Sequence, residues 1–152
     1  MKPKIKVAQI GVGYWGPNLL SNLSSNPRCE LLMCVDLSDD RQNYVKSLYP
    51  NIEVSGHVDD VFNNSEIDAV VIATPVKTHY ELAMKALKNK KHILVEKPMA
   101  RTVKEVEEIE FLSEKNELIA MSGHTFLFNP AVKKICLLYT SDAADEEDSV
   151  DL

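Results

Sequence analysis

The sequence has little of what marks a secreted or membrane-spanning protein. Its 152 residues include three cysteines, an odd number that cannot form a closed set of disulfides. We therefore expect reduced, buried thiols in a cytoplasmic protein, rather than a disulfide framework or a metal site. No apolar run approaches the roughly 18–20 residues that span a bilayer, and the start of the chain has the pattern of a first strand, not of a signal peptide.

Most of the chain has no excess of either positive or negative charge. The net charge is −6, but the last eleven residues, DAADEEDSVDL, hold six acidic side chains and no basic one. The other acidic residues balance the 17 Lys and Arg. Because a neutral surface does not attract polyanions, we expect no nucleic-acid or membrane partner.

The sequence does have a regular alternation of strand-like and helix-like segments. The expected strands are 5–11, 30–36, 52–56, 68–75, 92–98 and 117–124. Helical patterns lie between them, for example at 17–26 and 39–48, and capping-box spacing in Thr78/Glu81 and Thr102/Glu105 opens two more. Near-continuous apolar strands alternating with helices predict a doubly wound parallel α/β sheet over residues 1–124.

A glycine-rich segment, GVGYWGPN, follows the first apolar run. Gly11, Gly13 and Gly16 have the G-x-G-x-x-G spacing of a dinucleotide-binding loop between a strand and a helix. In such loops the glycines allow a tight turn, close approach of backbone to a pyrophosphate, and close packing of the helix. The helix N-terminus favours a diphosphate, so we expect the loop, including Tyr14 and Trp15, to contact the cofactor. A plain strand-to-helix turn is the alternative.

An acidic residue lies where this fold places its ribose ligand. Asp36 ends the second strand, 20 residues after Gly16. Its carboxylate would repel a 2′-phosphate by about 4 kcal/mol at ~4 Å and an effective dielectric of ~20. The sequence thus predicts NAD over NADP, although Arg41 could host the extra phosphate, and Asp36 could be only a helix cap.

Polar residues also end the fourth and fifth strands, at the edge where open α/β sheets bind ligands. Thr74 and Pro75 end the fourth strand, and His79 follows at the next helix start. Glu96 and Lys97 end the fifth strand, directly before a proline. A lysine in this position is either a functional group or a solvated surface charge.

With these residues in place, the chain resembles the Gfo/Idh/MocA oxidoreductases. The resemblance rests on GVGYWG, Asp36, ATPVKTHYELAMKAL, HILVEKP and GHTFLFNPAV. It implies a Rossmann domain of an NAD(P)-dependent dehydrogenase that acts on a sugar, nucleotide-sugar or cyclitol hydroxyl. The segments GYWG and GHTFLFNP most resemble those of members that act on UDP-linked N-acetyl sugars.

The resemblance also implies roles for the residues after the fourth and fifth strands. Lys97 would lie beside the nicotinamide ribose and the substrate hydroxyl, where it could orient or share the proton as the catalytic residue. Glu96, Thr74 and Pro75 would line the nicotinamide half, and His79 the pocket nearby. For His79 the alternative is a helix-start residue whose ring is already hydrogen-bonded.

Family members carry a second α/β domain that completes the active site and usually mediates oligomerisation. We expect 125–135 to begin the connection to that domain and 136–152 to be a non-native acidic tail without a fold element, a genuine acidic tail being the alternative. The chain would then bind cofactor without turnover, form homo-oligomers only as a longer protein, and expose Phe126, Leu127 and Phe128. A stand-alone dinucleotide-binding sensor or regulatory module remains an alternative function. A methyltransferase is a weaker one, because it would not explain Glu-Lys-Pro.

Overall fold

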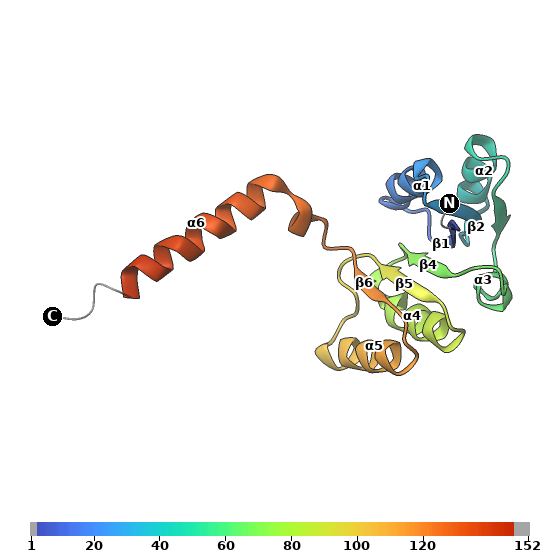
Figure 1. Ribbon diagram of the computed structural model, residues 1–152. Coiled ribbons are helices and arrows are strands. Elements are labelled where there is room, and N and C mark those ends of the chain that lie inside the picture. Colours follow the sequence, from blue (N-terminus) through green and yellow to red (C-terminus); the bar gives the residue numbers. More distant parts are fainter. Residues whose placement is uncertain (1–2, 148–152) are drawn as a thin grey trace.

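One parallel sheet forms the centre of the protein (Figure 1). The computed structural model describes residues 3–147, and within them the strand order is β3-β2-β1-β4-β5-β6. Every neighbouring pair runs parallel. The doubly wound α/β fold predicted from the sequence is confirmed. The strands are β1 (Ile5–Ile10), β2 (Cys29–Val35), β3 (Glu53–Ser55), β4 (Ala69–Ile72), β5 (His92–Val95) and β6 (Ala120–Ser122).

Helices cover both faces of the sheet. The covering helices are α1 (Gly16–Ser25), α2 (Asp39–Leu48), α3 (Val58–Asn63), α4 (His79–Lys88) and α5 (Val103–Lys115). The chain also contains α6 (Pro130–Glu147) and the short 3₁₀ helices η1 (Val76–Thr78) and η2 (Thr125–Phe128). The short α3 had no counterpart among the elements expected from the sequence. It is nevertheless anchored, because Val61 and Phe62 are buried.

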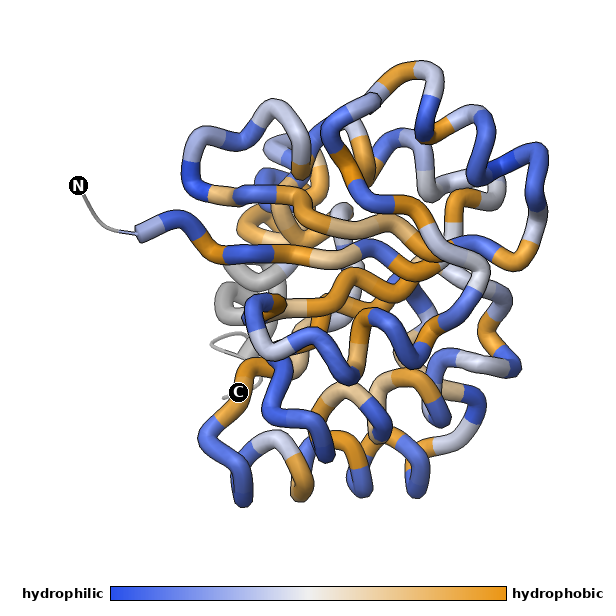
Figure 2. The backbone as a smooth tube through the Cα atoms, turned by 90° about the vertical axis from the view of Figure 1, so that its right-hand side faces the viewer, coloured by the Kyte–Doolittle hydropathy of each residue, from blue (hydrophilic) through white to orange (hydrophobic). Residues whose placement is uncertain are grey.

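Two apolar clusters correspond to the two faces. The larger joins β1, β2, β4 and β5 to buried residues of α3, α4 and α5, including Phe62, Leu87 and Ile109. The smaller joins the other face of β2 to α1 and α2 through Leu20 and Val45. Figure 2 shows the result, with hydrophobic strands inside and hydrophilic turns of helix outside. Burial of apolar area on both faces explains why the strands are nearly continuous apolar runs.

The chain reverses direction across the sheet beside β1. It winds from β1 through β2 to β3 on one side, and then returns to place β4 on the other side of β1. The connections that leave β1 and β4 at their carboxyl ends therefore diverge. This topological switch point is where open α/β sheets leave room for a ligand.

Only one of the two expected capping boxes forms. At the start of α5 the Thr102 hydroxyl accepts from the backbone N–H of Glu105, whose carboxylate accepts from the N–H of Thr102. The box expected at Thr78 is wrong. The Thr78 hydroxyl lies 2.8 Å from both the Thr74 hydroxyl and the Pro75 carbonyl oxygen, because η1 turns it back toward the end of β4.

The region after β6 departs from the expectation of a tail without a fold element. α6 runs without interruption from Pro130 through the first residues of the acidic segment to Glu147. The sequence of this helix is rich in the helix-forming residues Leu, Ala and Glu. The helix projects from the rest of the protein (Figure 1). None of the helices in the described part of the chain is long and apolar enough to cross a membrane. The predictions made for 148–152 lie outside the described residues.

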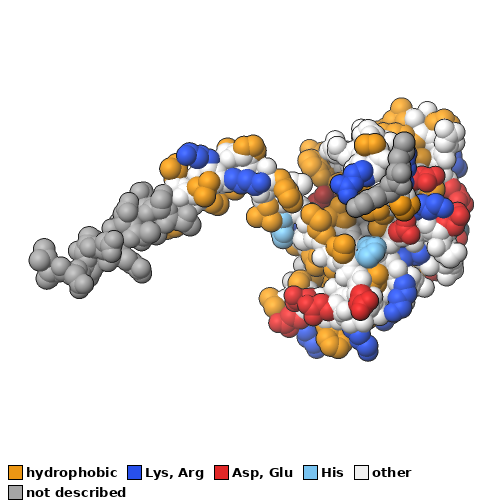
Figure 3. Space-filling view, in the orientation of Figure 1, with side chains coloured by type: hydrophobic (Ala, Val, Ile, Leu, Met, Phe, Trp, Pro, Cys, Tyr) orange, Lys and Arg blue, Asp and Glu red, His pale blue; other side chains and the backbone are white. Residues whose placement is uncertain are grey.

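The apolar segment before α6 is exposed, as expected from the sequence. Phe126, Leu127 and Phe128 have 70, 65 and 64% of their surface exposed. Figure 3 shows apolar side chains beside Lys and Arg on this projecting part. Cys34 is buried as expected, but Cys29 is half-buried and Cys136 is exposed on α6.

Candidate functional site

The glycine loop begins with a turn that only glycine accommodates. Gly11 has φ +97°, and a Cβ added there would lie 2.6 Å from the carbonyl oxygen of Ala73. The Gly11 N–H donates to Val35 O at 2.8 Å, which holds the loop against the end of β2. The first glycine therefore serves the tight turn predicted for it, at the closest approach between the β1 and β4 ends.

The other two glycines have opposite surroundings. A Cβ at Gly16 would lie 2.6 Å from the Gly11 carbonyl oxygen, so this glycine allows α1 to start directly against the loop. A Cβ at Gly13 would meet no protein atom within 4 Å. Since Gly13 does not need to be small for the fold, its open surroundings fit a backbone that a ligand approaches closely.

Asp36 is fixed beside this loop at the end of β2. Its Oδ2 accepts from the Val12 N–H at 2.6 Å and its Oδ1 accepts from the Ser38 N–H at 2.9 Å. Ser38, not Asp36, is the N-cap residue of α2. The carboxylate is half-buried. Burial of the neighbouring Cys34 thiol, together with the charge of Asp36, raises the pKa of this thiol to about 12. Cys34 is therefore protonated near neutral pH and supplies no thiolate.

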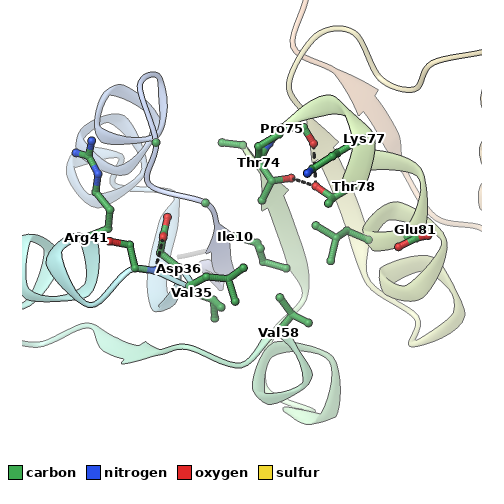
Figure 4. Close-up of a pocket in the computed structure, with 16 residues that line it drawn as sticks. Ile10, Val35, Asp36, Arg41, Val58, Thr74, Pro75, Lys77, Thr78 and Glu81 are labelled. Carbon is green, nitrogen blue, oxygen red and sulfur yellow. Dashed lines mark hydrogen bonds between the residues drawn. The ribbon is translucent and has the colours of Figure 1, made fainter.

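A cavity of about 660 Å³ lies between the two diverging halves of the sheet. One wall comes from β1, the glycine loop and the start of α2, and the other from the segment after β4 and the start of α4 (Figure 4). Six of the predicted site residues line it, and Figure 4 shows the Arg41 side chain extending outward from the Asp36 side. They are Gly11, Gly13, Asp36, Arg41, Thr74 and Pro75.

Six other predicted site residues do not line this cavity: Tyr14, Trp15, Gly16, His79, Glu96 and Lys97. Within the loop, Tyr14 is 96% exposed and Trp15 is 45% exposed. Gly16 is buried at the start of α1. The structure thus brings together the glycine loop, Asp36 and the Thr74–Pro75 segment, and leaves the residues after β5 outside the cavity.

His79 lies inside the protein and is not a wall of the cavity. It is 2% exposed, its Nδ1 is 2.8 Å from the Pro98 carbonyl oxygen, and its Nε2 is 2.7 Å from the Thr74 carbonyl oxygen. The expectation that His79 lines the pocket is replaced by the alternative of a hydrogen-bonded helix-start histidine. The ring links the end of β4 to the segment after β5.

Glu96 and Lys97 lie at the exposed end of β5. The Lys97 side chain is exposed, and its backbone N–H donates to Glu96 Oε2 at 3.2 Å. Glu96 is half-buried next to Gly123, whose added Cβ would lie 3.3 Å from the carboxylate. Through the Pro98 carbonyl, His79 fixes the backbone on the other side of Lys97. The lysine is therefore held by its backbone while its ammonium reaches solvent.

Sequence reasoning missed several residues of the site. Val58, Lys77, Thr78, Glu81 and Leu82 line the cavity. Thr78 and Glu81 were noted only for their capping-box spacing, and no motif predicts a ligand contact for any of the five. Gln9, which donates hydrogen bonds to the glycine loop, could have been singled out from the sequence, because a polar side chain inside a buried strand needs hydrogen-bond partners. The described residues contain no cluster of three or more side chains that could hold a metal ion.

Comparison with known proteins identifies the family of this chain. The family model described as an oxidoreductase family with an NAD-binding Rossmann fold matches residues 5–124. The uncharacterized oxidoreductase YdgJ of Escherichia coli K12 is 33% identical over 74% of this chain and 32% of its own length. The scyllo-inositol 2-dehydrogenase (NADP(+)) IolW of Bacillus subtilis 168 is 28% identical over 82% of this chain and 36% of its own. The chain spans about a third of the length of the curated relatives it matches.

Solved structures show the same fold. The apo scyllo-inositol dehydrogenase from Lactobacillus casei superimposes with a TM-score of 0.83 at 22% identity, covering 92% of this chain and 42% of that one. GenD2 from gentamicin A biosynthesis, in complex with NAD, gives 0.81 at 23% identity, with 86% and 37% covered. At this level of identity the likeness concerns the fold alone. With the family model covering β1 to His124, the chain belongs to the Gfo/Idh/MocA oxidoreductase family and contains its NAD-binding Rossmann fold.

Proposed function

We propose that this chain binds NAD with the adenosine ribose at Asp36 and the pyrophosphate at the glycine loop. The observation that carries the proposal is Gly13, whose missing Cβ faces open space at the cavity while Gly11 and Gly16 are packed against protein. The N-terminus of α1 follows directly and offers free N–H groups to an anion. Asp36, fixed by two backbone N–H groups, presents an acceptor for ribose hydroxyls.

A preference for NAD over NADP follows from the same carboxylate. A 2′-phosphate placed beside Asp36 would meet an anion that the protein holds in position. Arg41 is the competing feature, since it also lines the cavity and its charge would favour a phosphate. Among the relatives, IolW is named as an NADP(+) enzyme.

For the longer protein we propose a dehydrogenase acting on a hydroxyl of a sugar, nucleotide sugar or cyclitol. The bound nicotinamide would supply the hydride acceptor. Lys97 would orient or share the hydroxyl proton, because its exposed ammonium is held at the carboxyl end of β5 by its backbone neighbours. The inositol dehydrogenases among the relatives support the cyclitol class, and UDP-linked N-acetyl sugars remain a narrower prediction.

We further propose that the chain by itself binds cofactor without turnover. The support is the arrangement of the site, where Lys97 is exposed and lies outside the cavity that Asp36 and the segment after β4 line. Residues 136–152 would then be dispensable for binding, and homo-oligomers would form through parts beyond 1–124. The proposed location is the cytoplasm. The second candidate is a stand-alone sensor or regulatory module, favoured by the same exposure of Lys97, and it predicts binding without any role for this lysine.

Calorimetric titration of the chain with NADH and with NADPH tests the binding proposal. We expect NADH to bind more tightly, and the Asp36→Ala variant to lose this preference. Asp40→Ala, which removes an exposed acid from the first turn of α2, is the matched control and should retain it. Absence of binding by either nucleotide would overturn the proposed function, and tighter binding of NADPH would overturn the cofactor preference.

The dehydrogenase and the sensor are distinguished by Lys97→Ala in a version extended to the length of the relatives. A proton-handling lysine predicts a fall in kcat of about 10²-fold on a sugar or cyclitol substrate. Retained turnover with this variant would refute the catalytic role. A wild-type extended protein that binds NAD but oxidises none of these substrates would favour the sensor.

A further inference from the structure

Gln9 is a polar side chain in an otherwise apolar part of the core. It lies near the carboxyl end of β1 and has no exposed surface, between Ala8 and Ile10, which are also fully or nearly fully buried. Buried polar side chains are retained where they have specific partners, because an apolar residue of similar size fills the same space at lower cost.

The partners of Gln9 belong to the glycine loop. Its Nε2 donates to the carbonyl oxygen of Gly11 and to that of Gly16, both at 2.9 Å. Two carbonyl acceptors require the amide nitrogen at this position, so the orientation of the amide group follows from its surroundings. One side chain thus joins the first and the last glycine of the loop from beneath.

Gln9 and Asp36 hold the same peptide group from opposite sides. The Gly11 carbonyl accepts from Gln9, while the Val12 N–H of that peptide donates to Asp36 Oδ2 at 2.6 Å. Because the C=O and N–H of a trans peptide point in opposite directions, these two bonds fix its plane. The next peptide leads to Gly13, whose open side faces the cavity.

The oxygen of the Gln9 amide indicates which atoms of this side chain matter for the loop. Gln9 Oε1 is one of two buried side-chain atoms without a hydrogen-bond partner in the described part of the chain, the other being Ser122 Oγ. Leaving a buried carbonyl oxygen unsatisfied is unfavourable. A glutamine is therefore kept for its two N–H donors, which face the loop.

We propose that Gln9 is a positioning residue for the pyrophosphate-binding loop and that it raises the affinity for the diphosphate part of the dinucleotide. It acts through the Gly11–Val12 peptide, together with Asp36, and does not touch the ligand. The inference rests on the proposed function, since it concerns the loop as a diphosphate site. It adds a residue that the glycine pattern does not contain.

The test compares two probes on the full chain, ADP and adenosine, by calorimetry or NMR titration. Gln9→Met removes both donors and keeps an unbranched side chain of similar length. We expect it to lower the affinity for ADP by about tenfold and the affinity for adenosine by less than about twofold, the larger loss corresponding to the loss of about one effective hydrogen bond. Loss of general stability would lower both affinities alike, so equal losses, or none, would overturn the proposal.

Lys91→Met is the matched control. Lys91 is also buried and donates to two backbone carbonyls, those of Asn64 at 2.7 Å and Ile67 at 2.9 Å, but it lies at the amino end of β5. Its loss should reduce stability and leave the affinity for ADP within about twofold of the wild type. An ADP-specific loss in this variant equal to that of Gln9→Met would contradict a local role for Gln9.

A second measurement keeps the inference falsifiable if Gln9→Met does not fold. In the wild-type chain, the side-chain amide protons of Gln9 should be protected from exchange with solvent and should shift on addition of ADP but not of adenosine. Protons that exchange freely, or that respond equally to both ligands, would overturn it. If wild-type protein binds adenosine but not ADP, or binds neither, the failure lies in the proposed function and not in the role of Gln9.

Discussion

The two halves of the ligand edge are built in different ways. Around β1 and β2, backbone groups and buried side chains hold one another, as in the bonds from Gln9 to Gly11 and from Val12 to Asp36. Around β4 and β5, the polar side chain proposed for chemistry, Lys97, is exposed and only its backbone is held. His79 provides the internal support of this second half.

This difference separates binding from reaction. A loop fixed by its own hydrogen bonds is preorganised and can bind a nucleotide as it stands. An exposed lysine has a defined starting point for its side chain but lacks surroundings that would fix the ammonium relative to a substrate. We therefore expect variants in the first half to change folding and nucleotide affinity, and variants of Lys97 to change neither.

The largest effect should come from Gly11→Ala. The substitution forces a side chain into φ +97° and within 2.6 Å of Ala73 O, so we expect the free energy of unfolding to fall by about 3 kcal/mol or more. Gly13→Ala is the matched control, because nothing lies within 4 Å of its Cβ. It should change stability by less than about 0.5 kcal/mol while lowering affinity for ADP. Urea denaturation and calorimetry measure both, and similar losses of stability would contradict the division of roles.

The next effect concerns His79→Ala. Removing a buried ring whose Nδ1 and Nε2 lie 2.8 and 2.7 Å from two carbonyl oxygens should lower the free energy of unfolding by about 2–3 kcal/mol. His92→Ala, at the amino end of β5 with one backbone bond from Ile119, should have a smaller effect. In folded His79→Ala, NADH should lose affinity relative to ADP, because the freed segment belongs to the β4–β5 half. A uniform loss for both ligands would show that the two halves are not separable.

A smaller, selective effect is expected from Asp36→Asn. Removing the charge while keeping the shape should shift the ratio of NADPH to NADH affinity by about tenfold toward NADPH, which corresponds to about 1.4 kcal/mol. Asp40→Asn on α2 should leave the ratio unchanged. An unchanged ratio in Asp36→Asn would mean that Arg41, and not Asp36, governs the cofactor preference.

The sequence alone predicts the first half of the site better than the second, for a physical reason. Gly11, Gly16 and Asp36 act through backbone geometry and strand order, and these follow from a local pattern. The role of His79 depends on Pro98, nineteen residues away and beyond β5, so no local spacing reveals it. Likewise, the prediction of a capping box at Thr78 was wrong, because the Thr78 hydroxyl is hydrogen-bonded to the Thr74 hydroxyl and to the Pro75 carbonyl oxygen.

The same reasoning applies to the end of the chain. The acidic composition after Cys136 suggested a tail that fits no element of the fold, but α6 passes through that point without a break, as far as Glu147. Helix propensity of Leu, Ala and Glu, together with the start at Pro130, outweighs the change in charge. The exposure of Phe126, Leu127 and Phe128, which was expected from the second domain of the family, agrees with the structure.

The smallest effect should come from Lys97→Ala in this chain. The side chain is exposed and no salt bridge of the described residues involves it, so stability should change by less than about 0.5 kcal/mol. ADP affinity should stay within about twofold, because the lysine lies outside the Asp36 cavity. Lys88→Ala, an exposed lysine of α4, is the control, measured by the same denaturation and calorimetry. A Lys97→Ala variant that loses stability or ADP affinity while Lys88→Ala does not would show that the lysine is part of the binding half, and the separation of binding from reaction would fail.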